Sequence, residues 1–84
     1  MLFNFDVPQK VYIWMKDMHF SIDVIWLNQK KIVTWIEQDF SPASYTKKPA
    51  RSVCSPKADT MYVLEVPAGD AGRLGIKTGS QLLF

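Results

Sequence analysis

Alternating apolar and polar positions recur along the chain and predict several β-strands. The clearest alternation covers residues 20–27, and residues 11–15, 32–37 and 61–66 are also rich in β-branched and aromatic side chains. The short polar segment 28–30 predicts a hairpin turn between two of these strands. Within residues 20–27 we expect one face to carry Phe20, Ile22, Val24 and Trp26, and the other Ser21, Asp23, Ile25 and Leu27.

The remaining segments have weaker patterns. Residues 1–9 are interpreted as a lead-in, and residues 81–84 as a last strand. Residues 38–59 hold three prolines without clear periodicity, which predicts a long ordered loop with one short strand near 51–54. Residues 67–74 begin with proline and are followed by glycine, a pattern that favours one or two helical turns.

Length and composition bound the fold. A chain of 84 residues, 48% of them hydrophobic and 21% charged, is expected to form one ordinary globular domain over residues 1–84. The predicted fold class is mainly β: a small antiparallel sheet, barrel-like or sandwiched, with one short helix near residues 67–74.

The same composition argues against several classes of function. A net charge of +2 gives no strong nucleic-acid signal. Cys54 and His19 are the sole residues of their types, so an intramolecular disulfide and a multi-histidine metal site are excluded, and no cofactor is predicted. No apolar run approaches the roughly 20 residues of a membrane span. The chain as written lacks a signal peptide, which predicts a soluble cytoplasmic protein, or an exported one if an N-terminal segment is missing.

Charged residues inside β-rich runs are the main candidates for a site. Lys16 closes one run, and Asp23 and Glu65 interrupt two others. A buried charge needs a partner, because desolvating an isolated ion costs several kcal/mol. One interpretation is structural: Lys16 pairs with a carboxylate, or each carboxylate accepts hydrogen bonds from loop amides. The other is a ligand pocket with a polar floor and with Trp14 as a wall.

Three functions stay open at this point. The leading hypothesis is a ligand-binding module whose site contains Trp14, Lys16, Asp23 and Glu65, with no catalytic or metal-binding residue. Lys16 suggests that the ligand is small and polar or anionic. The first alternative is a metal-independent hydrolase that uses a carboxylate pair, although we lean against an enzyme. The second is a structural or assembly domain without a ligand.

Four motifs resemble a known family. They are residues 12–18 (Tyr-Ile-Trp-Met-Lys-Asp-Met), 21–27, 62–69 and 75–79, in this order. Together they are similar to the bacterial and archaeal family known as domain of unknown function 192. The resemblance implies a compact, mostly antiparallel β fold with a short helix, and it implies no established activity. Positions characteristic of the family fall on Trp14, Met15, Lys16, Asp23 and Glu65.

The chain also departs from the family pattern. Asp17 stands where the family usually has Asn, and Ser21 where it often has Pro, so a pocket here would differ from the typical one. Family members usually have an earlier strand before the Met-Leu-Phe that opens this chain, which suggests an N-terminally shortened member. An edge strand without its partner would then favour homo-association.

Overall fold

The computed structural model of the chain describes residues 1–14, 19–41, 52–54 and 57–84. Its centre is a four-stranded antiparallel sheet with the strand order β1-β6-β3-β4, and two short strands form a second, antiparallel sheet. The elements are β1 (Leu2–Gln9), β2 (Tyr12–Trp14), β3 (Ile22–Leu27), β4 (Val33–Phe40), β5 (Ser52–Cys54), β6 (Thr60–Pro67) and α2 (Asp70–Arg73).

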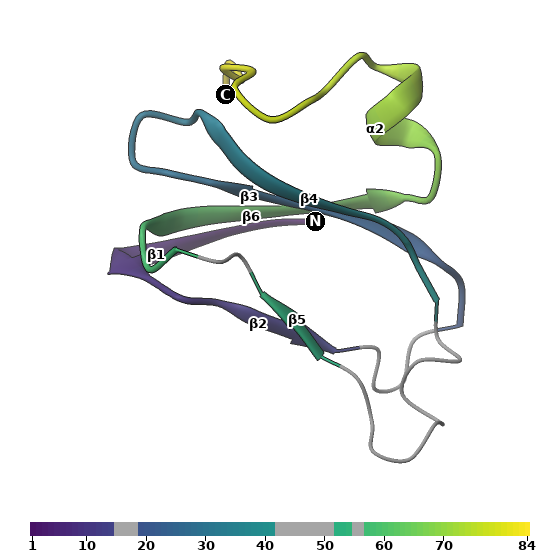
Figure 1. Cartoon of the computed structure of the whole chain (residues 1–84), viewed down its shortest axis with the longest axis horizontal. Helices are drawn as coiled ribbons and strands as arrows, with labels where there is room; N and C mark the ends of the chain where they lie inside the picture. Colours follow the sequence, from purple (N-terminus) through teal and green to yellow (C-terminus); the bar gives the residue numbers. More distant parts are fainter. Residues whose placement is uncertain (15–18, 42–51, 55–56) are drawn as a thin grey trace.

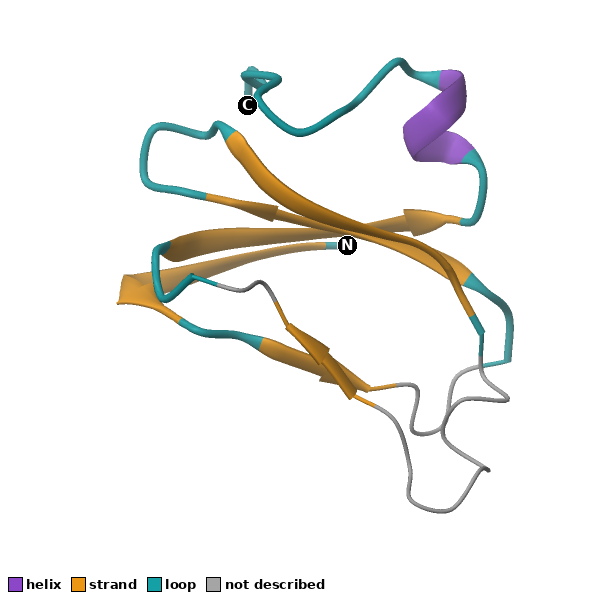
Figure 2. Cartoon of the chain, viewed as in Figure 1, coloured by secondary structure: helices purple, strands orange, loops and turns teal. Residues whose placement is uncertain are grey.

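The central sheet is the middle layer of three. Figure 1 shows β2 and β5 on one side of it, and α2 with the C-terminal segment on the other. Figure 2 shows that the layer on the α2 side consists of this helix and the loops that precede and follow it. Since both faces are covered, β3 at the centre of the sheet is buried along its whole length.

Alternation along β3 divides the hydrophobic core in two. Val24 and Trp26 belong to the cluster on the side of β2, while Ile25 and Leu27 belong to the cluster that includes Ala71 of α2. This confirms the two faces predicted from the sequence, because successive side chains of a strand point to opposite sides. The Trp26 indole N–H donates a hydrogen bond to the Val11 carbonyl oxygen at 3.0 Å, which ties the chain just before β2 to the sheet.

A β-bulge interrupts the β3–β4 ladder near one of its ends. Ile22 pairs with Phe40 and Val24 pairs with Glu37, so β4 carries one extra residue between these pairs. Asp39 lies in this bulge with φ 52°, in the left-handed region that few residues other than glycine adopt. The bulge turns the Asp39 amide toward β3, where its hydrogen-bond acceptor lies.

The structure confirms the mainly β class and corrects several details. The sheet is not closed into a barrel, since β1 and β4 are its edges, and the sandwiched alternative describes the layers better. Residues 1–9 were wrongly interpreted as a lead-in, because Leu2–Gln9 forms β1 against β6. The alternation of this segment is weakened by Asp6 and Pro8, which an edge strand tolerates.

Other sequence predictions have mixed outcomes. The short helix lies within residues 67–74, and a short strand lies within 51–54 as expected. The prediction of a last strand at residues 81–84 was wrong. Among the described residues near the C-terminus, one isolated bridge joins Gln81 to Ile32. The parts of the predicted loop at 42–51 and 55–56 lie outside the described residues. Within the described ranges, no helix is long and apolar enough to cross a bilayer.

Candidate functional site

Asp23 is a buried carboxylate that joins three segments of the chain. Its side chain is on the α2 side of the sheet and is 1% exposed. Oδ1 accepts a hydrogen bond from the Asp39 amide at 2.9 Å, and Oδ2 accepts from the amides of Gly69 and Ala71 at 3.0 and 3.1 Å. Charge-assisted hydrogen bonds of this kind compensate the desolvation of a buried carboxylate. Asp23 therefore fixes the β4 bulge and the start of α2 to the central strand.

A cavity of about 370 Å³ lies over this carboxylate. Both oxygens of Asp23 already accept hydrogen bonds from backbone amides, so little acceptor capacity faces the cavity. Small residues from the segment around α2 form part of the remaining wall. The cavity is lined by Asp23, Gln38, Asp39, Ala68, Gly69 and Gly72.

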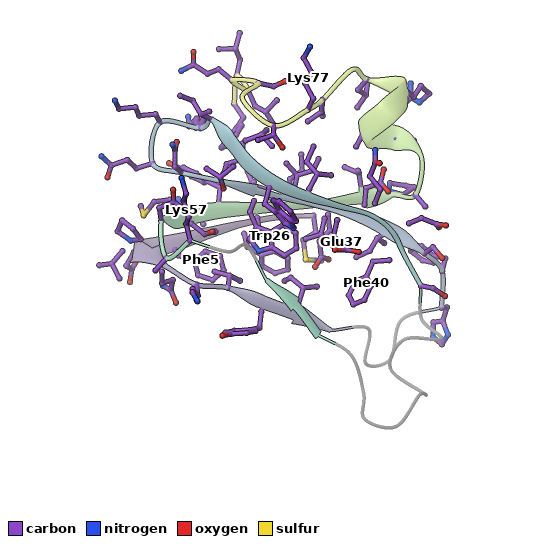
Figure 3. All side chains as sticks on the ribbon, in the orientation of Figure 1. Phe5, Trp26, Glu37, Phe40, Lys57 and Lys77 are labelled. Carbon is purple, nitrogen blue, oxygen red and sulfur yellow. The ribbon has the colours of Figure 1, made fainter. Side chains whose placement is uncertain are left out.

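Glu65 lies on the opposite face of the sheet from Asp23. It is the cross-strand partner of Val24, whereas Asp23 pairs with Val66, and neighbouring positions of a strand point to opposite faces. Glu37 is the partner of Val24 on the other neighbouring strand, so Glu37 and Glu65 flank Val24 on one face. Figure 3 shows Glu37 near Trp26 and Phe40, on the side that faces β2 and β5.

Glu65 borders an apolar cavity of about 250 Å³ at one end of the sheet. Burial raises the pKa of Glu65 above its ordinary value, and the positive charge of the Met1 amino group offsets part of that rise. Phe20 is 60% exposed at this cavity and offers an aromatic surface. The lining residues are Met1, Phe20, Ile22, Glu65, Val66 and Pro67.

A comparison with known families agrees with the motifs. The model of the family domain of unknown function 192 (DUF192), described as "Uncharacterized ACR", matches residues 1–84. The chain belongs to the DUF192 family. No curated protein matches this DUF192 chain.

Two solved structures share the fold of this DUF192 chain. One is a protein of unknown function from Novosphingobium aromaticivorans, with 24% identity and a TM-score of 0.81 over 100% of the chain. The other is described as a putative transcription regulator from Sinorhizobium meliloti, with 28% identity and a TM-score of 0.84 over 96% of the chain. The DUF192 chain spans 56% and 58% of the length of these two proteins.

The described geometry separates two of the predicted site residues. Asp23 and Glu65 occupy opposite faces of the sheet, so their carboxyl groups point away from each other. The assignment of Trp14, Lys16, Asp23 and Glu65 to one ligand site stays a prediction. Trp14 pairs with Ser52 through the backbone, but its side chain and all of Lys16 lie outside the described residues. Whether Lys16 approaches either carboxylate therefore stays a prediction.

Sequence reasoning missed two features of the Glu65 face of this DUF192 fold. Glu37 ends the predicted third strand, but its position beside Val24 depends on the pairing of β3 with β4, which the alternation alone does not reveal. Phe20 was assigned to the same strand face as Ile22, Val24 and Trp26, yet it lies before β3 and is exposed at the cavity. Among the described residues, no group of three or more His, Cys, Asp or Glu side chains is placed to hold a metal ion.

Proposed function

We propose that this chain is a small ligand-binding module, with Glu65 and Phe20 as the main contacts to the ligand. The observation that supports this most is the position of a half-buried carboxyl group at the edge of an apolar cavity of about 250 Å³. Ligand sites commonly combine apolar walls with a few polar groups that orient the ligand. The small volume favours a compact ligand over a cofactor-sized one.

The chemistry of the wall favours a ligand with a hydrogen-bond donor and an apolar part. An ionised Glu65 only accepts hydrogen bonds, so an ammonium or hydroxyl group is its natural partner. Phe20 and Ile22 would contact the apolar part, with Phe20 also able to face a cation. The anionic ligand expected from the sequence depends on Lys16, and this proposal does not depend on that residue.

Three probes of similar size test this proposal. Benzylamine, benzyl alcohol and benzoate share a ring but differ in the charge and donor capacity of the polar group. In a titration followed by the amide resonances of the ¹⁵N-labelled chain, benzylamine should shift Ile22, Glu65 and Val66 at the lowest concentrations. Benzyl alcohol should act more weakly, and benzoate should bind least because it meets a carboxylate.

The outcome that contradicts the proposal is equally specific. If none of the probes shifts these amides, or if benzoate binds as well as benzylamine, the Glu65 cavity does not select a donor. The pH dependence offers a second check: benzylamine binding should weaken as the pH falls through the raised pKa of Glu65, because protonation removes the negative charge.

The two alternatives from the sequence have different support. The hydrogen bonds of Asp23 support a structural role for that residue, which is compatible with a binding site at Glu65 on the other face. A hydrolase using Asp23 and Glu65 together is not supported, since an acid and a base must converge on one reacting group.

A further inference from the structure

A third cavity, of about 350 Å³, lies at the end of the sheet where β3 turns into β4. Its lining includes two residues of opposite charge, Lys30 and Asp59, and the apolar residues Pro8 and Ile32. None of these residues belongs to the Glu65 cavity. The full lining is Pro8, Asn28, Gln29, Lys30, Ile32 and Asp59.

Asp59 has a buried oxygen that lacks a hydrogen bond. Its Oδ1 atom is shielded from solvent and has no partner within the described part of the chain. Leaving a buried acceptor unsatisfied is costly, and such atoms are rare in native proteins unless water, an ion or a ligand supplies the donor. Because Asp59 lines the cavity, a small movement of its side chain would expose this oxygen to a ligand that brings a donor group.

The turn that carries Lys30 is held by its own hydrogen bonds. The side-chain oxygen of Asn28 accepts from the amides of Lys30 and Ile32 at 2.9 and 3.1 Å. The Lys30 carbonyl oxygen accepts from the side-chain amide of Gln81 at 3.2 Å. The backbone of this wall is thus fixed before any ligand binds, which reduces the entropic cost of binding.

We infer that this cavity is a second site, which binds a small zwitterion with the chemistry of a free α-amino acid. The ligand ammonium group would donate to the Asp59 carboxylate, and the ligand carboxylate would accept from the Lys30 ammonium group. A short apolar side chain on the ligand would contact Pro8 and Ile32. The opposite charges on the cavity wall are complementary to those of such a ligand, so a ligand with only one charge would leave one of them without a partner.

Three probes of nearly equal size separate the contributions of the two charges. L-valine carries both groups, isobutylamine lacks the carboxylate, and isovalerate lacks the ammonium group. In amide titrations of the whole chain, L-valine should shift residues 28–32 and Asp59. It should bind about tenfold more tightly than either single-charge probe, since each lacks one charge-assisted hydrogen bond.

Two variants test the assignment of residues. Asp59→Asn and Lys30→Gln should each weaken L-valine binding by about tenfold or more. Lys77→Gln is the matched control, because Lys77 is an exposed lysine on the C-terminal segment (Figure 3) and its loss should leave binding unchanged. Thermal unfolding of each variant shows whether it is folded, and titrations are interpreted for folded variants.

Several results would overturn the inference. Binding of isobutylamine as tight as that of L-valine would exclude a role for the ligand carboxylate and for Lys30. Equal affinities of wild type and Asp59→Asn would exclude Asp59 as the ammonium acceptor. Amide shifts confined to Ile22, Glu65 and Val66 would place the zwitterion in the other cavity and would contradict a site at Asp59.

Discussion

Removing the Asp23 carboxylate should strongly destabilise the fold. In Asp23→Ala, the amides of Asp39, Gly69 and Ala71 lose their acceptor in a region closed to most of the solvent. An unsatisfied buried donor costs about 1–3 kcal/mol, and the amides nearer the surface recover part of this through water, so we expect a loss of roughly 3–5 kcal/mol. A chain of this length has a total stability of roughly 4–13 kcal/mol.

The isosteric variant Asp23→Asn refines this prediction. Its single carbonyl oxygen can replace Oδ2, which accepts from Gly69 and Ala71, but its amide group then faces the Asp39 N–H. One of three hydrogen bonds is lost, and we expect a loss of about 1–3 kcal/mol. Stability should decrease from wild type to Asp23→Asn to Asp23→Ala, because fewer backbone amides keep an acceptor at each step.

Urea unfolding followed by tryptophan fluorescence measures these losses, because Trp26 is fully buried in the folded state. Each kcal/mol lowers the melting temperature by about 4–8 °C in a domain of this size. Asp6→Ala is the matched control, since Asp6 is exposed on β1, and it should change stability by less than about 0.5 kcal/mol. A loss below about 1 kcal/mol for Asp23→Ala would refute the reasoning.

Three further predictions concern the core and the Glu65 face. Ile25→Ala should lower the free energy of unfolding by about 2–5 kcal/mol in urea titrations, because Ile25 is fully buried, whereas Val7→Ala at an exposed position should have little effect. Trp26→Phe removes the hydrogen bond to Val11 and should cost at least about 1 kcal/mol, with faster hydrogen exchange of the β2 amides as the structural readout. Burial raises the pKa of Glu65 in the folded state. The contribution of Glu65 to the free energy of unfolding is therefore fully present below the unfolded-state pKa and is lost as the pH rises through the folded-state pKa. Glu65→Gln should therefore flatten the decrease in wild-type stability across that pH window, as measured by urea unfolding at a series of pH values; an unchanged slope would contradict a raised pKa.

The sequence predicted the parts of this fold that depend on local alternation. Strand β3 and its two faces could be predicted because every position of residues 22–27 obeys a period of two, and both faces are covered. The β1 strand was missed because an edge strand with Asp6 and Pro8 lacks a continuous apolar face. The C-terminal residues have side chains that favour a strand, but they join the layer that covers the sheet through a bridge at Gln81 and through side-chain contacts.

The candidate site was harder to predict, since it depends on which strands are neighbours. Asp23 and Glu65 were both recognised as charges inside apolar runs, but their separation by the sheet follows from the register that pairs Val24 with Glu65. A shift of that register by one residue would have placed Glu65 on the face of Asp23. The Asp59 cavity gave no signal in the sequence, because its residues come from β1, the β3–β4 turn and the segment before β6.

The affinity of benzylamine for wild type, Glu65→Gln and the surface control Asp6→Asn tests the proposed function most directly. All three dissociation constants can be obtained from amide titrations at neutral pH. The account predicts that Glu65→Gln binds about tenfold more weakly while Asp6→Asn binds as wild type does, because only Glu65 accepts the ammonium group. Equal affinities for all three proteins would contradict a ligand site at Glu65.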